Sequence, residues 1–151
     1  MLHRATDVAL RTHQHEKRRA LHNAIVSAAS PTPPDVDKQA FFLRLIDELT
    51  INQIVVLAFY ADPMGWFMRR GRESQKYYSA SRSDALAQSY PEISGHLYVK
   101  ELVLGDLRNR GLLGSYDRMV TGGAVYDPIV TKLALEFLAY VRMEDSVPSP
   151  T

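Results

Sequence analysis

The chain contains no cysteine among its 151 residues. Disulfide bonds, thiolate nucleophiles and sites in which cysteine binds zinc or an iron–sulfur cluster are therefore excluded. A long apolar run is missing as well, since the longest, IVVLAFYA at residues 54–61, is far too short to cross a bilayer. The first residues, MLHRATDVALRTHQHEKRR, lack the apolar region of a signal peptide. We expect a cytoplasmic protein that does not enter the membrane.

The sequence also has no marked excess of either charge. Eighteen Lys and Arg stand against seventeen Asp and Glu, so the formal net charge is +1. This balance gives no general attraction to phosphate, and any surface that binds nucleic acid would have to be local. With 46% hydrophobic and 23% charged residues, the composition is that of a globular protein of one domain.

The N-terminal segment is expected to be a helix over about residues 7–29, because it contains neither proline nor glycine. Its apolar positions gather in the second half, whereas the middle, RTHQHEKRR, is almost wholly polar. We therefore expect the first turns to project from the body or to pack on a partner. The sequence SPTPPD at 30–35 ends the helix, since three prolines in four positions cannot continue it.

The next segments predict a compact helical core. Apolar residues recur at i, i+3, i+4 and i+7 over residues 41–49, which indicates a helix that begins at Asp35 or Asp37. Thr50 suits the N-cap of a third helix, INQIVVLAFYAD, whose wide apolar face is typical of the centre of a core. Pro63 can then occupy the first turn of a short helix, PMGWFMRRG.

The middle of the chain is less regular. Residues 69–84, RRGRESQKYYSASRSD, are polar and poorly periodic, and we expect a loop there. Ser83 is the expected cap of a short helix, SDALAQSYP. Ser94 is the expected cap of a longer one, SGHLYVKELVLGDLRNRG, and Gly111 stands where a left-handed C-terminal cap is needed.

The C-terminal part predicts a small hairpin followed by one more helix. Apolar and aromatic residues lie on both sides of Gly122 and Gly123 within residues 112–127, and a Gly-Gly pair between such stretches is a hairpin signal. Thr131 can cap the last helix, KLALEFLAYVRM. The predicted fold is mainly α, a helical bundle with a small C-terminal β-hairpin.

Two resemblances go with this pattern. The order of DELTINQIVVL, VLGDLRNRGLL, a hairpin and TKLALEFLAYV resembles the winged-helix arrangement of bacterial regulators, in which the helix before RGLL enters the major groove. The stretch from EKRRALHNA to LIDELT is similar to an uncharacterised bacterial protein family of unknown function. The resemblance implies a winged-helix-like C-terminal half and no mechanism. We expect an N-terminal helix at 1–30, a winged-helix-like helical domain at 35–143 and a tail at 144–151.

The winged-helix resemblance makes DNA binding the alternative function. A helix that reads DNA needs hydrogen-bond donors on its exposed face. The candidates for nucleic-acid contacts are Lys100, Arg108, Asn109 and Arg110 on the helix and Arg118 on the expected wing. Two acids, Glu101 and Asp106, lie among them, and the arginines of the helix stand at its C-terminal end. Both features weigh against reading of bases.

A protein partner or a second copy of the chain is the main expectation. The candidate contacts are Lys17, Arg18 and Arg19 on the first helix and Trp66 and Phe67 in the short helix, where aromatic residues can dock on a partner. The other interpretation is that the basic run is a solvated helix face and that the aromatic pair closes one end of the core.

No pattern of catalytic residues was found. His13, His15 and His22 lack the i, i+3 or i+4 spacing that would place two imidazoles on one ion, so no metal is expected. Asp47 and Glu48 diverge by about 100° on a helix, and they are expected to stabilise the N-terminus of the next helix instead. The sequence therefore predicts a non-enzymatic interaction or self-association module without cofactor or small-molecule substrate.

Overall fold

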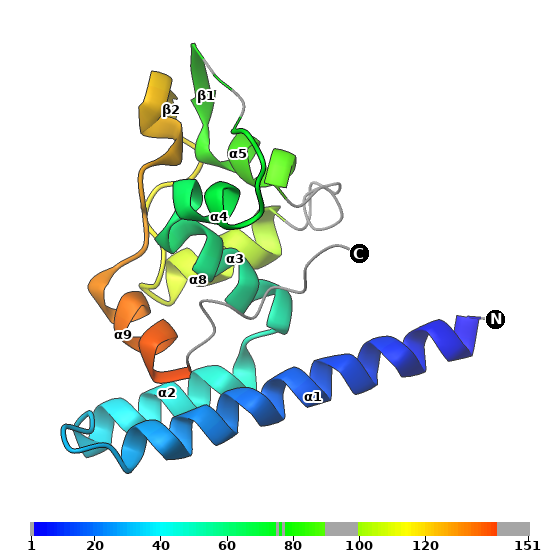
Figure 1. The fold of residues 1–151 in the computed structure, drawn as a ribbon, viewed down its shortest axis with the longest axis vertical. Helices are drawn as coiled ribbons and strands as arrows, with labels where there is room; N and C mark the ends of the chain where they lie inside the picture. Colours follow the sequence, from blue (N-terminus) through cyan, green and yellow to red (C-terminus); the bar gives the residue numbers. More distant parts are fainter. Residues whose placement is uncertain (1, 75, 77, 90–99, 142–151) are drawn as a thin grey trace.

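The structure, a computed structural model, describes residues 2–74, 76, 78–89 and 100–141, with the backbone alone for 2–10, 12, 13, 100 and 101. As predicted, this part of the chain is mainly helical with one small antiparallel sheet. Helices α1 (Leu2–Ala28) and α2 (Val36–Glu48) lie side by side at one end of the long axis (Figure 1). Strands β1 (Ser79–Ser81) and β2 (Met119–Thr121) lie at the other end.

The second half of α1 belongs to the core. Ala20 and Ala24 are buried there, and small side chains let helices approach closely. The Asn23 amide donates to the Val141 carbonyl at 2.8 Å, so α1 satisfies a carbonyl at the end of α9 (Lys132–Val141). The first half of α1 extends beyond the body (Figure 1). The expected segment 1–30 is thus divided between core and projection.

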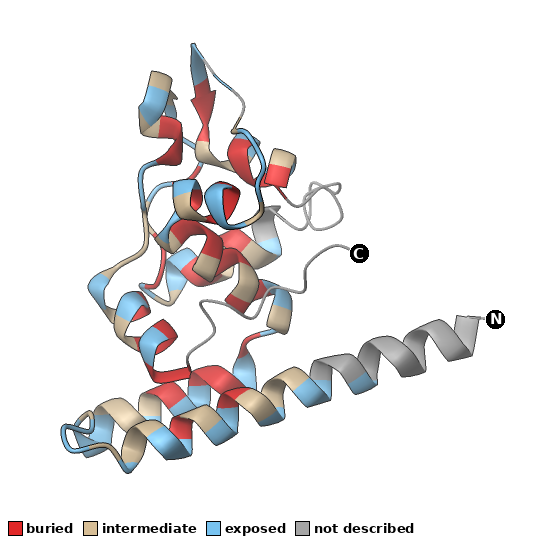
Figure 2. Ribbon diagram, in the orientation of Figure 1, coloured by how far each residue is buried: buried red, intermediate tan, exposed pale blue. Residues whose placement is uncertain are grey.

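Helix α3 (Ile51–Ala61) runs through the centre of the molecule, and buried residues gather along it (Figure 2). The predicted Thr50 cap is confirmed as a reciprocal capping box. The Gln53 N–H donates to the Thr50 hydroxyl at 3.1 Å, and the Thr50 N–H donates to the Gln53 side chain at 2.9 Å. Ile54 and Leu57 are fully buried, as the wide apolar face of this segment requires.

The short helix α4 (Pro63–Arg69) places its aromatic residues in the core. The Asp62 carboxylate accepts a hydrogen bond from the Gly65 N–H at 3.0 Å and so caps the helix. Trp66 and Phe67 stand edge to face with Phe59, at centroid distances of 5.7 and 6.4 Å. Because both side chains are buried, the assignment of Trp66 and Phe67 to a partner surface is corrected: they close the core.

The small sheet is present, but its strands pair differently from the expected hairpin. Strand β2 pairs with β1, which lies in the segment 69–84 that was expected to be a loop. After Gly122, whose φ of +56° suits glycine, the chain forms a 3₁₀ helix, η2 (Gly122–Tyr126), instead of a second strand. This turn buries the consecutive residues Val125 and Tyr126, which an alternating strand would place on opposite faces.

Of the remaining helices, α5 packs against the sheet and the turn that follows it. Helix α5 (Arg82–Ser89) begins just before its expected cap, Ser83. The predicted cap at Ser94 lies outside the described residues, and the helix is described from a π-helical turn, η1 (Lys100–Leu104), into α8 (Gly105–Asn109).

The predicted C-terminal cap of α8 and the predicted N-terminal cap of α9 are confirmed. Gly111 has a φ of +74°, the left-handed conformation expected after α8. The Thr131 hydroxyl accepts from the Ala134 N–H at 3.2 Å and so caps α9. The expected tail, 144–151, lies outside the described residues.

The capping box makes a first prediction. Thr50→Ala removes the acceptor for the Gln53 N–H, and we expect the free energy of unfolding to fall by about 1 kcal/mol. Thr50→Ser keeps the hydroxyl and should change it by only a few tenths of that amount. Urea denaturation followed by circular dichroism measures both variants. Equal stability of Thr50→Ala and the parent chain would contradict the role of the box.

Candidate functional site

The register of α1 against α2 is set by one hydrogen bond. The Lys17 ammonium group donates to the Asp47 carbonyl at 2.6 Å, and the two helices run antiparallel (Figure 1). Each residue advances a helix by about 1.5 Å, so residues the same number of positions from this contact lie at the same level. Counting from this contact places Leu21 within about one turn of Leu43 along the pair, and Ala28 within about one turn of Val36.

Exposed apolar side chains lie on both helices of this pair, and four of them repeat at whole helical turns. Leu21 and Ile25 are one helical turn apart on α1 and are 41% and 68% exposed. Leu43 and Val36 are two turns apart on α2 and are 42% and 81% exposed. Leu21 and Ile25 each follow a buried alanine and lie on the side of α1 from which Lys17 reaches α2. We call these four residues the α1–α2 strip.

The strip has opposite charges at its two ends. Arg18 is exposed at one end and forms no ion pair among the described residues. At the other end, Asp35 and Asp37 are exposed at the N-terminus of α2, where Asp35 also caps the helix through the Lys38 N–H at 2.9 Å. Of the three basic residues proposed as partner contacts, Lys17 is bonded to α2 and Arg19 lies 3.5 Å from Glu16.

Arg110, one of the candidate nucleic-acid contacts, is held within the fold. Its guanidinium group donates to Glu48 at the end of α2 and to Asp106 at 3.0 Å, and Gln53 donates to the same Asp106 carboxylate at 2.8 Å. The hydrogen bond with Glu48, followed by that with Asp106, raises the pKa of Arg110. Two carboxylates therefore balance its charge, and the group ties α8 to α2 and α3. Glu48 therefore forms an ion pair with Arg110, a contact that the sequence does not predict when it assigns Glu48 to the N-terminus of the next helix.

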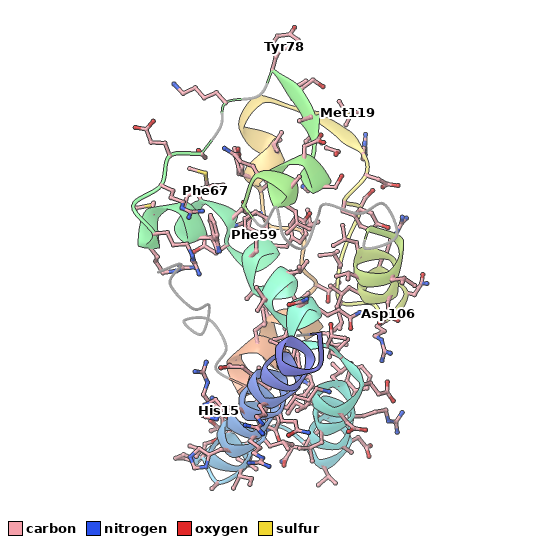
Figure 3. The ribbon with its side chains drawn as sticks, turned by 90° about the vertical axis from the view of Figure 1, so that its right-hand side faces the viewer. His15, Phe59, Phe67, Tyr78, Asp106 and Met119 are labelled. Atoms are coloured by element: carbon pink, nitrogen blue, oxygen red, sulfur yellow. The ribbon has the colours of Figure 1, made fainter. Side chains whose placement is uncertain are left out.

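The other candidates for nucleic-acid contacts, where their side chains are described, lie on two separate parts of the surface. Arg108 and Asn109 are exposed at the C-terminal end of α8, and the Lys100 side chain lies outside the described residues. Arg118 is exposed just before β2. Figure 3 shows Asp106 well away from Met119 of β2, so α8 and the sheet present separate parts of the surface.

A pocket that the sequence did not indicate adjoins β2. It has a volume of about 550 Å³ and is lined by Arg82, Arg118, Ser115, Thr121, Val120 and Ile129, among others. Arg82 and Arg118 come from segments far apart in the chain, and the pairing of β1 with β2 brings them to one cavity. Because sequence patterns report local periodicity, no signal could have joined these two arginines.

The histidines of α1 and Asp47 lie at the surface where they are described. His15 and His22 are exposed on α1, and the His13 side chain is not described. Across the described side chains, no three His, Asp or Glu residues are grouped as a metal ion would require. Asp47 is exposed, and its contribution to the fold is the carbonyl that Lys17 binds.

Comparisons of the chain with protein-family models, curated proteins and solved structures find no match. Within the described part of the chain, no helix combines the length and apolar character needed to span a membrane. The functional proposal therefore rests on the α1–α2 strip and the charged groups around it.

The Arg110 contacts make a second prediction. Arg110→Gln removes the charge that links Glu48 and Asp106, and we expect a loss of about 1 kcal/mol in the free energy of unfolding, since the group is partly exposed. The matched control, Arg108→Gln, removes the same charge two residues earlier and should change stability by less than about 0.5 kcal/mol. Thermal and urea denaturation of both variants provide the comparison. A loss for Arg108→Gln as large as for Arg110→Gln would contradict the bridging role.

Proposed function

We propose that the protein is a non-enzymatic interaction module that self-associates through the α1–α2 strip. One observation carries the proposal: exposed apolar side chains stand on both of two packed helices, Leu21 and Ile25 on α1 and Leu43 and Val36 on α2. Single exposed apolar residues are common on monomers, but a contiguous patch rimmed by charge is typical of an interaction site. The strip lies on a rigid helix pair, so few degrees of freedom are lost when it is covered.

A second copy of the chain is the occupant that the charges favour. A two-fold axis passing between Leu21 and Ile25 would place the same strip on both sides of an isologous contact. In that arrangement Arg18 of each copy lies level with the N-terminus of the other copy's α2, because Ala28 and Arg18 stand at equal distances from the axis. Arg18 then faces exposed Asp35 and Asp37. The antiparallel pairing matches opposite charges at both ends.

Self-association makes a third prediction. Ile25→Glu and Leu43→Glu each place a charge inside the apolar contact, and we expect each to weaken dimerisation by about tenfold or more. Met68→Glu is the matched control, since Met68 is 77% exposed on α4, away from the strip. Sedimentation equilibrium of the full chain measures all three variants. A parent chain that stays monomeric at every concentration, or equal weakening by Met68→Glu, would overturn the proposal.

A charge reversal distinguishes the proposed specific dimer from nonspecific association. Arg18→Glu should weaken the dimer and make its dissociation less sensitive to salt, because it removes the attraction to Asp37. The double variant Arg18→Glu with Asp37→Arg should recover most of the lost affinity. Recovery supports the antiparallel register, and failure of the double variant to recover contradicts that register.

DNA binding is the second candidate, and the topology of the sheet end favours it. Strand β1 is followed by α5, α8 and β2, and β2 returns to pair with β1. This is the order of strands and helices in the winged-helix regulators that the sequence resembles. The balance of charge and the engagement of Arg110 by two carboxylates weigh against it. Self-association therefore remains the first proposal.

The DNA candidate makes a fourth prediction. If residues of α8 and the strand end hold DNA, the chain should bind a random duplex at low salt with a Kd on the order of 10⁻⁴ to 10⁻⁶ M, weakening as salt rises. Arg108→Gln should weaken this binding, whereas Arg44→Gln on α2 should not. Fluorescence anisotropy measures the titration. Absence of binding at low salt would exclude this candidate.

A further inference from the structure

We propose that the pocket beside β2 binds a phosphate group through Arg82 and Arg118. Both arginines line one pocket of about 550 Å³, together with Ser115 and Thr121. Arginine presents several N–H donors in a planar fork that matches the oxygens of phosphate. The proposal concerns the end of the molecule opposite the α1–α2 strip and does not depend on self-association (Figure 1).

The Arg82 side chain has one buried N–H group, at Nε, without a hydrogen-bond acceptor among the described residues. A buried donor on a charged group is costly when it is unpaired, so an acceptor is expected to occupy this position. The nearby carboxylate of Asp84 is already engaged by the Ser81 N–H at 2.7 Å and the Ser81 hydroxyl at 2.9 Å.

The backbone of Arg82 is fixed before any ligand arrives. The Tyr60 hydroxyl donates to the Arg82 carbonyl at 2.9 Å, and the next residue's N–H, that of Ser83, donates to the Tyr116 carbonyl at 3.2 Å. Tyr60 is buried in α3, so the start of α5 is anchored on the core. These bonds fix the point on the backbone from which the Arg82 side chain extends.

Arg118 supplies the second charge from the residue just before β2, next to Arg82 by the register of the two strands. It is exposed and makes no ion pair within the described part of the chain. Its neighbour Asp117 is the acid closest in sequence, and the Ser115 hydroxyl donates to Asp117 at the long distance of 3.3 Å. That bond is weak enough for the hydroxyl to turn toward a phosphate oxygen. Since neither arginine pairs with a carboxylate among the described residues, the pocket favours a negatively charged group.

The size and floor of the pocket leave room for more than a phosphate ion. Val120, Ala124 and Ile129 give this open pocket an apolar lining beside the two arginines. The phosphate can therefore be carried on a larger body. A free phosphomonoester and a phosphate of a nucleic-acid backbone share the same recognition by the two arginines, and the experiment below distinguishes them.

The experiment titrates the full chain, labelled for amide NMR, with inorganic phosphate at constant ionic strength and pH. We expect saturable shifts at the amides of residues 114–121. Arg82→Gln and Arg118→Gln should each weaken binding by about tenfold, since each removes a charged hydrogen bond. Arg44→Gln on α2 is the matched control and should bind as the parent does. Because Arg118 is exposed, its variant keeps the test decisive even if Arg82→Gln folds poorly.

The second arm repeats the phosphate titration in the presence of a random DNA duplex. Displacement of phosphate by the duplex supports a backbone phosphate as the natural occupant, and persistence of phosphate binding supports a free phosphorylated molecule. Either result supports recognition of phosphate by this pocket. Shifts that never saturate, or that are the same in Arg118→Gln and the parent chain, would overturn the proposal.

Discussion

The buried helix α3 is the constraint on which both ends of the molecule depend. The helix begins after its N-cap, Thr50, next to the end of α2. It ends just after Tyr60, on the side of the sheet. Tyr60 then makes two contacts of its own: its hydroxyl donates to the Arg82 carbonyl at 2.9 Å, and its carbonyl accepts from the Ile129 N–H at 3.3 Å. Arg82 and Ile129 both line the pocket. The core helix thus positions a surface that it does not itself form.

Local signals predicted the parts of this fold that local forces determine. The Thr50 and Thr131 caps could be inferred because a hydroxyl and the N–H groups of the following turn lie within a few residues of each other. Gly111 could be inferred because a left-handed residue after a helix favours glycine. The apolar face of α3 could be inferred because burial on all sides leaves few polar positions.

The contacts that give the protein its candidate sites are distant in sequence. Strand β1 has only three residues, too few for an alternating pattern, and its partner β2 lies beyond α5 and α8. Arg110 and Glu48 are 62 positions apart, so neither predicts the other. For Trp66 and Phe67 the sequence favours the core but leaves a partner surface open, because aromatic side chains serve both. Tertiary packing decided each case.

The two proposed surfaces lie at opposite ends of the long axis, and this separation has a consequence for binding (Figure 1). A dimer formed through the α1–α2 strip would leave both β2 pockets uncovered and facing away from the shared contact. Two small phosphorylated molecules would then bind independently, because no part of one pocket adjoins the other. Avidity would arise only for a ligand long enough to reach both ends at once, as a nucleic acid is. Self-association would therefore raise the apparent affinity for a polymeric phosphate and leave that for a free phosphomonoester unchanged.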